Sequence, residues 1–197
     1  LLVFYQKNWT LVDTLLTNYI MHSGGADGSD TMWDIIGRVY GLEVVRHYYY
    51  INKTPRGNFP ISNSAYEEGK CAVYRANNTL KRQNFEKYMF LLSRNWCQVK
   101  NSDAIYAIAE GFNGNTVKGG TGWAVQMAID SDKDVFVFDQ SRSRWFTYDI
   151  ELSEWKHSET PVLRLDFAGI GTREIKPNGL KAIIDCYDIT TKEITLF

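Results

Sequence analysis

Residues 20–50, with the sequence IMHSGGADGSDTMWDIIGRVYGLEVVRHYYY, carry the clearest signal of the fold class. A short apolar segment at residues 20–22 is followed by a glycine turn. The next segment carries Trp33, Ile36 and Tyr40 on one face, at helical spacing. A glycine ends that segment, and the β-branched and aromatic run after it is typical of a strand. The stretch therefore predicts a strand, a helix and a second strand, which is the repeating unit of a parallel sheet.

The rest of the chain continues this alternation of strands and helices. It predicts an α/β fold in one domain spanning residues 1–197, with a mostly parallel sheet flanked by helices and a small antiparallel hairpin. The expected helices are at 11–19, 71–97 and 124–129 and from Pro177 onward, the expected strands at 104–109, 135–138 and 162–167, the loops at 51–70 and 110–118, and the hairpin at 143–158.

The composition is that of a packed globular protein and argues against several functions. Hydrophobic residues make up 44% and charged residues 23%, which excludes disorder, and the net charge of -1 argues against general nucleic-acid binding. No apolar run approaches the ~20 residues of a membrane span. Three cysteines without CxxC spacing predict reduced core thiols, and three histidines without HxxxH spacing predict no metal site. We expect a cytoplasmic protein without a cofactor, whose aromatic-rich surface has room for a homo-oligomer interface.

Three short glycine clusters stand out, each between an extended apolar segment and a helical one. Right-handed crossovers place all strand-to-helix turns at the carboxyl edge of a parallel sheet, so these clusters are expected to meet there. Glycine lets the backbone approach a ligand closely, and a helix N-terminus attracts phosphate or carboxylate. Neither GxGxxG nor GxxxxGK[ST] occurs, which argues against a usual dehydrogenase or P-loop NTPase. The clusters are Ser23-Gly24-Gly25-Ala26, Gly119-Gly120-Thr121-Gly122 and Gly169-Ile170-Gly171-Thr172.

Three segments together resemble the SLOG superfamily, which includes the "lonely guy" phosphoribohydrolases and ligand-sensing relatives. Residues 23–30, SGGADGSD, are similar to the family's SGGAxGxD turn. Ser93-Arg94-Asn95 followed by Ser102-Asp103-Ala104-Ile105 resembles its RK…SDA helix and strand, and residues 119–122 resemble its PGGxGT phosphate loop. The resemblance implies a Rossmann-like sheet and a nucleotide or ADP-ribose-like ligand.

The chain departs from this family where hydrolysis is concerned. In the hydrolytic members an arginine on the RK helix and a glutamate three residues after the GT pair are associated with N-glycosidic cleavage. Arg94 matches the arginine, but Gln126 stands at the glutamate position, Lys118 at the proline and Trp123 at the threonine. Glutamine cannot serve as a general acid or base. The resemblance therefore favours ligand binding over hydrolysis.

The order of the segments is a second departure. Residues 167–174, FAGIGTRE, resemble the GIGSR-type turn that follows the first strand in many relatives, yet here they lie near the end of the chain. A circular permutation that moves the first strand and helix to the C-terminus accounts for this order, because chain termini usually lie close together at the surface. The alternative is a coincidental GxGT turn.

The candidate site residues follow from these clusters and from the resemblance. The candidate ligand-binding residues are Ser23, Gly24, Gly25, Asp27, Arg94, Asp103, Gly119, Gly120, Thr121, Gly122, Trp123, Gly169, Gly171, Thr172 and Arg173. The candidate catalytic residues are Arg94, Asp27, Asp30 and Glu174.

Several of these residues also have a structural interpretation. Arg94 could hold phosphate or pair with a surface carboxylate. Asp27 and Asp30 could bind a ribose or cap the following helix, and Trp123 could stack on a base or fill the core.

Three functions fit the sequence. The first is a binding protein that senses or sequesters a phosphorylated nucleoside or an ADP-ribose-derived, including cyclic, nucleotide. The second is an enzyme that cleaves the N-glycosidic bond of a nucleotide, with an acid such as Asp27, Asp30 or Glu174 replacing the missing glutamate. The third is an interaction protein that retains glycine turns without a ligand.

Overall fold

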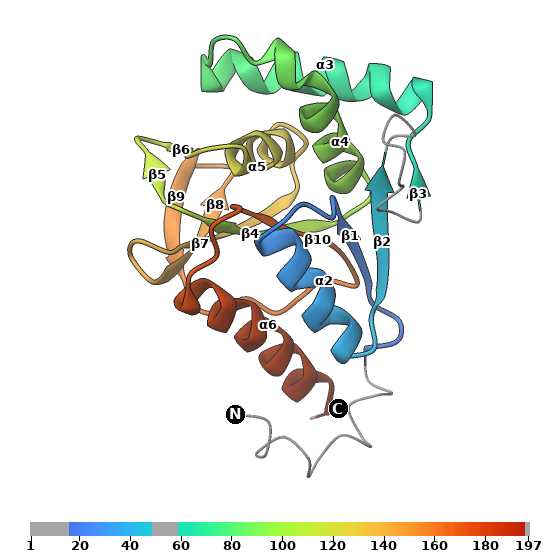
Figure 1. Cartoon of the computed structure of the whole chain (residues 1–197). Helices are drawn as coiled ribbons and strands as arrows, with labels where there is room; N and C mark the ends of the chain where they lie inside the picture. The colour runs from blue at the N-terminus through green and yellow to red at the C-terminus, as the bar shows by residue number, and fades with distance from the viewer. Residues whose placement is uncertain (1–15, 49–58, 196–197) are drawn as a thin grey trace.

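The computed structural model describes residues 16–48 and 59–195, which form one eight-stranded sheet with helices on both faces (Figure 1). The strands lie in the order β3-β2-β1-β10-β4-β7-β8-β9. Their bounds are β1 Ile20–Ser23, β2 Glu43–Tyr48, β3 Phe59–Pro60, β4 Ala104–Ala109, β7 Asp134–Asp139, β8 Arg144–Asp149, β9 Glu154–Ser158 and β10 Asp166–Gly171. The helices are α2 Ser29–Val39, α3 Asn63–Leu80, α4 Met89–Lys100, α5 Thr121–Ile129 and α6 Pro177–Thr195, with a 3₁₀ turn η1 at Glu86–Tyr88.

The sheet is mostly parallel, which confirms the predicted α/β class. The six strands from β3 to β7 in the sheet order pair in parallel, and the hairpin of β8 and β9 extends the sheet with antiparallel pairing. A separate two-stranded antiparallel hairpin, β5 Phe112–Asn113 and β6 Thr116–Val117, lies within the segment expected to be a loop.

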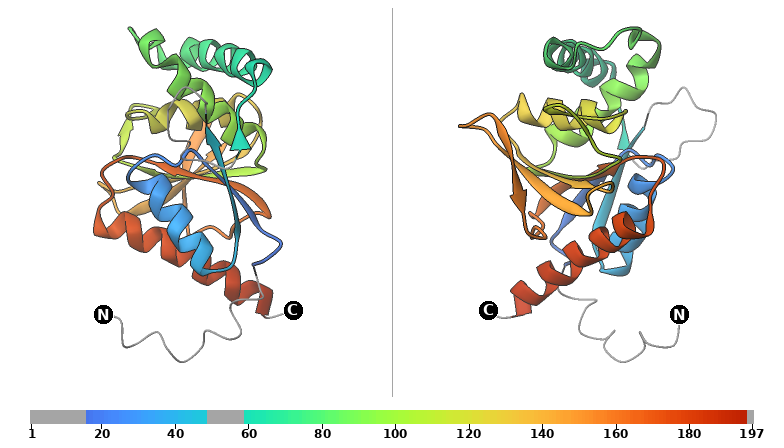
Figure 2. Two further views of the ribbon diagram at one scale, coloured as in Figure 1. Left: turned by 45° about the vertical axis from the view of Figure 1, so that its right-hand side comes forward. Right: turned by 90° about the vertical axis from the view of Figure 1, so that its left-hand side faces the viewer.

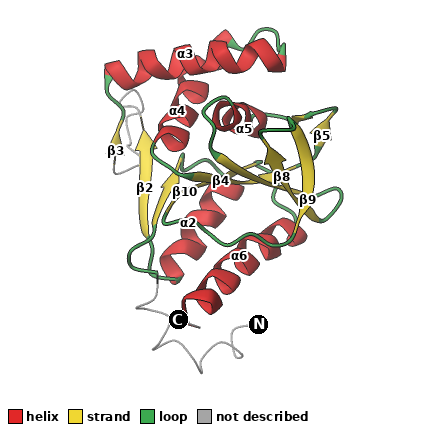
Figure 3. Cartoon of the chain, turned by 180° about the vertical axis from the view of Figure 1, so that it is seen from behind, coloured by secondary structure: helices red, strands yellow, loops and turns green. Residues whose placement is uncertain are grey.

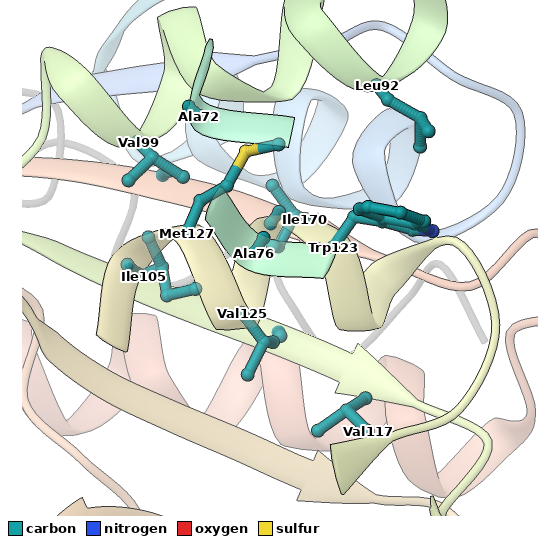
Figure 4. Packing of buried hydrophobic residues seen from close by; sticks show 14 of the residues in the cluster. Ala72, Ala76, Leu92, Val99, Ile105, Val117, Trp123, Val125, Met127 and Ile170 are labelled. Atoms are coloured by element: carbon teal, nitrogen blue, oxygen red, sulfur yellow. The ribbon is translucent and has the colours of Figure 1, made fainter. Parts of the chain in front are cut away.

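Helices cover both faces of the sheet, so the central strands are buried on both sides (Figures 1 and 2). Successive residues of β4 face opposite layers, with Ile105 and Ala107 toward α4 and α5, and Tyr106 and Ile108 toward α2 and α6. Helix α3 packs outside α4 and α5 and contributes small residues to that core (Figure 4). On the other face Trp33 of α2 is fully buried, as its helical spacing predicts.

The last strand of the chain, β10, lies in the middle of the sheet, between β1 and β4 (Figures 1 and 3). From β1 the chain proceeds outward through β2 to β3, and from β4 it proceeds in the other direction to β7. The order of the parallel strands therefore reverses at β10. Reversal points of this kind create a crevice at the carboxyl edge of an open α/β sheet.

Two segments differ from the sequence-based prediction. The single helix expected at 71–97 is two helices, because Lys81 adopts a left-handed conformation that ends α3. The loop expected at 51–70 contains β3 and the first turns of α3, where the Ser62 hydroxyl accepts a hydrogen bond from the Ala65 N–H as an N-cap.

Other expectations concern single residues or undescribed segments. The expected helix at 11–19 lies outside the described residues except for its last four positions, which are not helical. Cys97 and Cys186 are buried as predicted, whereas Cys71 is exposed, and none of the three forms a disulfide. Among the residues that the structure describes, no helix is long and apolar enough to cross a membrane.

Candidate functional site

A cavity of about 700 Å³ lies where the strand order reverses, at the carboxyl ends of β1, β10 and β4. All three glycine clusters contribute to its wall, as the sequence predicts from right-handed crossovers. Helix α4 and the turn η1 close another side. The lining residues are Ala26, Asp30, Tyr88, Leu91, Leu92, Arg94, Asn95, Gln98, Glu110, Lys118, Gly119, Gly120, Thr121, Trp123, Ala124, Ile170, Gly171, Thr172, Arg173 and Glu174.

The turns that follow β1 and β10 are interlocked by hydrogen bonds. The backbone N–H and the hydroxyl of Ser29 both donate to the carbonyl oxygen of Thr172, at 3.0 and 2.8 Å. The N–H of Gly171 donates to Oδ1 of Asp30 at 3.0 Å. A Cβ on Gly28 would lie 2.5 Å from Cα of Arg173. The start of α2 and the end of β10 therefore form one interlocked unit.

The first turn is itself compact. The buried Ser23 hydroxyl accepts a hydrogen bond from the N–H of Gly25 at 3.0 Å. Gly25 has φ 60°, a left-handed conformation that glycine adopts without strain. The N-cap position of α2 is occupied by Gly28, which has no side chain that could cap the helix. Neither Asp27 nor Asp30, for which capping was one interpretation, occupies that position.

The second glycine loop, directly before α5, is open instead. A Cβ on Gly119 or on Gly120 would meet no atom within 4 Å. Gly119 has φ 67°, so glycine is favoured there by conformation, whereas Gly120 has an ordinary helical φ of -60°. Thr121 begins α5 and borders the cavity. In the first turn of α5 the N–H groups of Gly122 and Trp123 donate to the carbonyl oxygens of Gly119 and Gly120. The N–H groups of Gly120 and Thr121, which come before them, have no partner within the helix, so they form the anion-attracting end of this loop.

Arg82 holds the open loop in place through hydrogen bonds. Its guanidinium donates to the carbonyl oxygens of Gly119 at 2.5 Å and Val117 at 2.7 Å. It also lies over the Trp123 ring, 5.5 Å from the ring centroid. Burial lowers the pKa of Arg82 from its usual value. Arg82 is therefore a positioning residue for the loop, because it binds two of its carbonyl oxygens.

The opposite wall carries a buried carboxyl group. Desolvation by burial raises the pKa of Asp30 to about 6, although Arg94 and the N–H groups of Gly171, Ala26 and Gly24 favour its ionised form. A buried carboxyl group with a pKa this close to neutrality can exchange a proton near physiological pH. The site thus combines a titratable acid with the cation of Arg94.

Trp123 belongs mainly to the core. Its side chain is only 4% exposed, and its ring packs on Phe85 with centroids 5.1 Å apart. It lies among apolar residues of α4 and α5, close to Leu92 (Figure 4). Of the two interpretations, filling the core accounts for its burial, although Trp123 also borders the cavity.

Seven of the predicted ligand-binding residues do not line the cavity: Ser23, Gly24, Gly25, Asp27, Asp103, Gly122 and Gly169. Asp103 precedes β4, at the amino edge of the sheet, where its N–H donates to the carbonyl oxygen of Asp166. Gly169 lies inside β10, where a Cβ would meet Trp33 at 2.7 Å. Gly122 packs against the carbonyl of Val117, and Asp27 is exposed outside the cavity.

The third cluster differs from the prediction because strand β10 extends through residue 171. Gly169 and Gly171 are therefore strand residues, and the turn begins only at Thr172. Gln126, at the position of the family glutamate, also lies outside the cavity, and its amide donates to Oδ1 of Asp130 at 2.8 Å. Arg173 and Glu174 do line the cavity, and Gln140 holds their loop by donating to the Glu174 carbonyl oxygen.

Sequence reasoning missed several residues of the site. Gln98 follows Arg94 by one helical turn, so the spacing of four residues could have placed it on the same face of α4. Arg82 carries no local signal, because its role depends on the packing of α3 against α5. Among residues 16–48 and 59–195, no group of three or more His, Cys, Asp or Glu side chains is arranged to hold a metal ion.

Comparisons of the chain with protein-family models, with curated proteins and with solved structures gave no match. The resemblance to the SLOG superfamily therefore stays a prediction from short motifs. Function has to be argued from the chemistry of the cavity.

Proposed function

We propose that this protein binds a phosphorylated nucleoside or an ADP-ribose-derived nucleotide in the cavity at the strand-order reversal, as a sensor or sequestering protein. The proposal rests mainly on the glycine loop at Gly119 and Gly120, which borders open space. Neither packing nor backbone conformation requires a glycine at position 120. The cavity, at about 700 Å³, is within the usual size range of small-molecule sites.

The anionic part of the ligand is best accommodated at the loop before α5. The helix N-terminus attracts negative charge there, and Lys118 lines the same region. Arg94 and Arg173 supply two further cations around the cavity. Backbone N–H groups and a few local cations can hold a small anion without a basic surface, so the net charge of -1 is compatible with this role.

The position of β10 supports the family resemblance on which the ligand class partly depends. When the β10–α6 unit is placed first and the two-residue edge strand β3 is left out, the parallel strands follow the order 3-2-1-4-5, which is the order of Rossmann-like sheets. A circular permutation explains how a strand that is last in the sequence reaches this central place.

A second candidate function is N-glycosidic cleavage of a nucleotide, and one observation favours it. Asp30 lines the cavity with its pKa raised to about 6 by burial, beside Arg94. A protonated carboxyl group can donate a proton to a leaving base. Release of free base from a nucleoside monophosphate by the wild type, and its loss in Asp30→Asn, would support cleavage. Intact nucleotide after long incubation would exclude it.

The experiment for binding is calorimetric titration with the nucleoside 5′-monophosphates and ADP-ribose. Arg94→Gln should weaken binding of the tightest ligand by at least about tenfold, because it removes charge-assisted hydrogen bonds. Arg75→Gln is the matched control, since Arg75 is exposed on α3 and does not line the cavity. Absence of any heat of binding and of any thermal shift with every nucleotide would refute the proposal.

A further inference from the structure

Gln98 is a buried polar residue whose amide donor is not satisfied by the described part of the protein. Its side chain is 1% exposed and lies in the wall of the cavity. Within the described part of the chain, its amide nitrogen Nε2 has no hydrogen-bond partner. Buried donors in folded proteins are nearly always paired, so an unpaired one on a residue that lines a cavity requires an explanation.

Two other polar groups approach the same point. A Cβ on Gly24 would overlap Nε2 of Gln98 and would lie 2.9 Å from Oδ2 of Asp30 and 3.0 Å from Nη2 of Arg94. An amide donor, a carboxylate acceptor and a guanidinium donor therefore converge beside Gly24. The missing side chain at Gly24 is what allows them to meet.

Asp30 is held in place by the protein and keeps capacity for one more partner. Backbone N–H groups of Gly171, Ala26 and Gly24 donate to its carboxylate. A carboxylate offers about four acceptor sites, so three such bonds leave room for a further donor. Gln98 donates through the NH₂ group at Nε2. Asp30 and Gln98 together therefore present an acceptor and a donor to a ligand.

This combination matches hydroxyl groups better than phosphate. A hydroxyl donates one hydrogen bond and accepts others, so a vicinal diol can donate to Asp30 and accept from Gln98. A phosphate at this point would face the Asp30 carboxylate, and like charges repel. The phosphate is therefore better placed at the Gly119–Gly120 loop, which orients the ligand across the cavity.

We propose that Gln98 and Asp30 form a subsite for the vicinal hydroxyls of a ribose, and that Gln98 makes the protein prefer ribonucleotides over 2′-deoxyribonucleotides. This inference rests on the proposed function, since it specifies the ligand of the same cavity. It assigns a specificity role to a residue outside the glycine turns.

The test is calorimetric titration with adenosine, guanosine, cytidine and uridine 5′-monophosphates and ADP-ribose, each against its 2′-deoxy counterpart. The wild type should prefer the ribo form by at least about tenfold. In Gln98→Met, which keeps the side-chain length but removes the donor, the preference should fall below about twofold, with affinity for the deoxy form unchanged. Gln98→Glu should lose the preference as well, because it replaces the donor with an acceptor.

A stability measurement separates this role from a structural one. Removing an unpaired buried amide should leave the urea midpoint of Gln98→Met unchanged or higher. Gln126→Met is the matched control, because that buried amide is paired with Asp130 and lies outside the cavity. It should lower the midpoint and leave the ribose preference intact.

The outcomes distinguish the two proposals. If no nucleotide binds the wild type, the proposed function fails and this inference falls with it. If nucleotides bind but the wild type does not prefer ribose, or Gln98→Met retains the preference, the proposed function stands and the Gln98 subsite is refuted.

Discussion

The glycine turns at the two sides of the cavity are built in opposite ways. Where β1 and β10 end, glycines are needed because other protein atoms lie too close for a side chain. A Cβ on Gly28 would lie 2.5 Å from Cα of Arg173, and a Cβ on Gly171 would lie 2.5 Å from the carbonyl oxygen of Ile108. At Gly119 and Gly120, before α5, a Cβ would meet nothing within 4 Å. Similar sequence clusters therefore serve packing on one side and leave open space on the other.

The contrast between the two loops shows when a glycine indicates function. A glycine that packing or a positive φ requires says little about ligands. Gly120 has neither requirement, so close approach of a ligand is the explanation we propose for it. The interlocked turns should then govern stability, and the open loop should govern binding. Substitutions in the two regions should therefore differ in how strongly they lower stability.

The largest loss of stability is expected for Gly28→Ala, in the interlocked unit. Gly28 has φ 94° and ψ -127°, which an alanine adopts only with strain, and the new Cβ would collide with the Arg173 backbone. Strain and overpacking together should cost roughly 4 kcal/mol of unfolding free energy. Urea denaturation measures it, and a loss below about 1 kcal/mol would contradict the interlocked packing.

The next largest effect concerns the pH dependence that Asp30 adds to the interlocked unit. Its folded-state pKa of about 6 lies above the ordinary value near 4, so protonation favours the folded state. This contribution is complete below about pH 4 and is lost as pH rises through 6, and it amounts to about 3 kcal/mol. Asp30→Asn can keep the acceptor for the Gly171 N–H but does not titrate.

Unfolding free energies of the wild type and Asp30→Asn should therefore diverge with pH. Between pH 4 and pH 7.5 the wild type should lose about 3 kcal/mol relative to the variant. Parallel stability profiles across this range would show that the Asp30 carboxyl is not desolvated.

A smaller loss is expected for Arg82→Met, which removes the support of the open loop. Two hydrogen bonds to the carbonyl oxygens of Gly119 and Val117 disappear, at a cost of roughly 2 kcal/mol. Nucleotide affinity should fall as well, because the loop loses its fixed shape. Arg75→Met, on the exposed surface of α3, should change neither quantity, and equal effects of the two substitutions would contradict the positioning role.

Much of the fold could be predicted from the sequence because its signals are local. Apolar spacing identified α2 through Trp33, and the continuous apolar run at 104–109 identified a strand buried on both faces. The crossover rule then predicted that the glycine clusters would meet at one edge. The left-handed residue Lys81 and the short strand β3 were missed, because neither has a distinctive local pattern.

The site was less predictable because its contacts are long-range. Gly169 was expected to face a ligand, but it makes room for Trp33 of α2, a contact between residues far apart in the sequence. Asp103 was assigned to the site from a motif, yet it precedes its strand and so lies at the opposite edge of the sheet. The paired role of Gln98 with Asp30 required knowledge of where Gly24 lies.

The role of the open glycine loop can be tested by comparing Gly120→Ala with the wild type, using the tightest-binding nucleotide as the probe. Unfolding free energies from urea denaturation should agree within about 0.5 kcal/mol, since the Cβ meets no protein atom at an ordinary φ. Calorimetric affinity should fall at least about tenfold, which is 1.4 kcal/mol. Unchanged affinity at unchanged stability would contradict the claim that the open glycine loop is where the ligand binds.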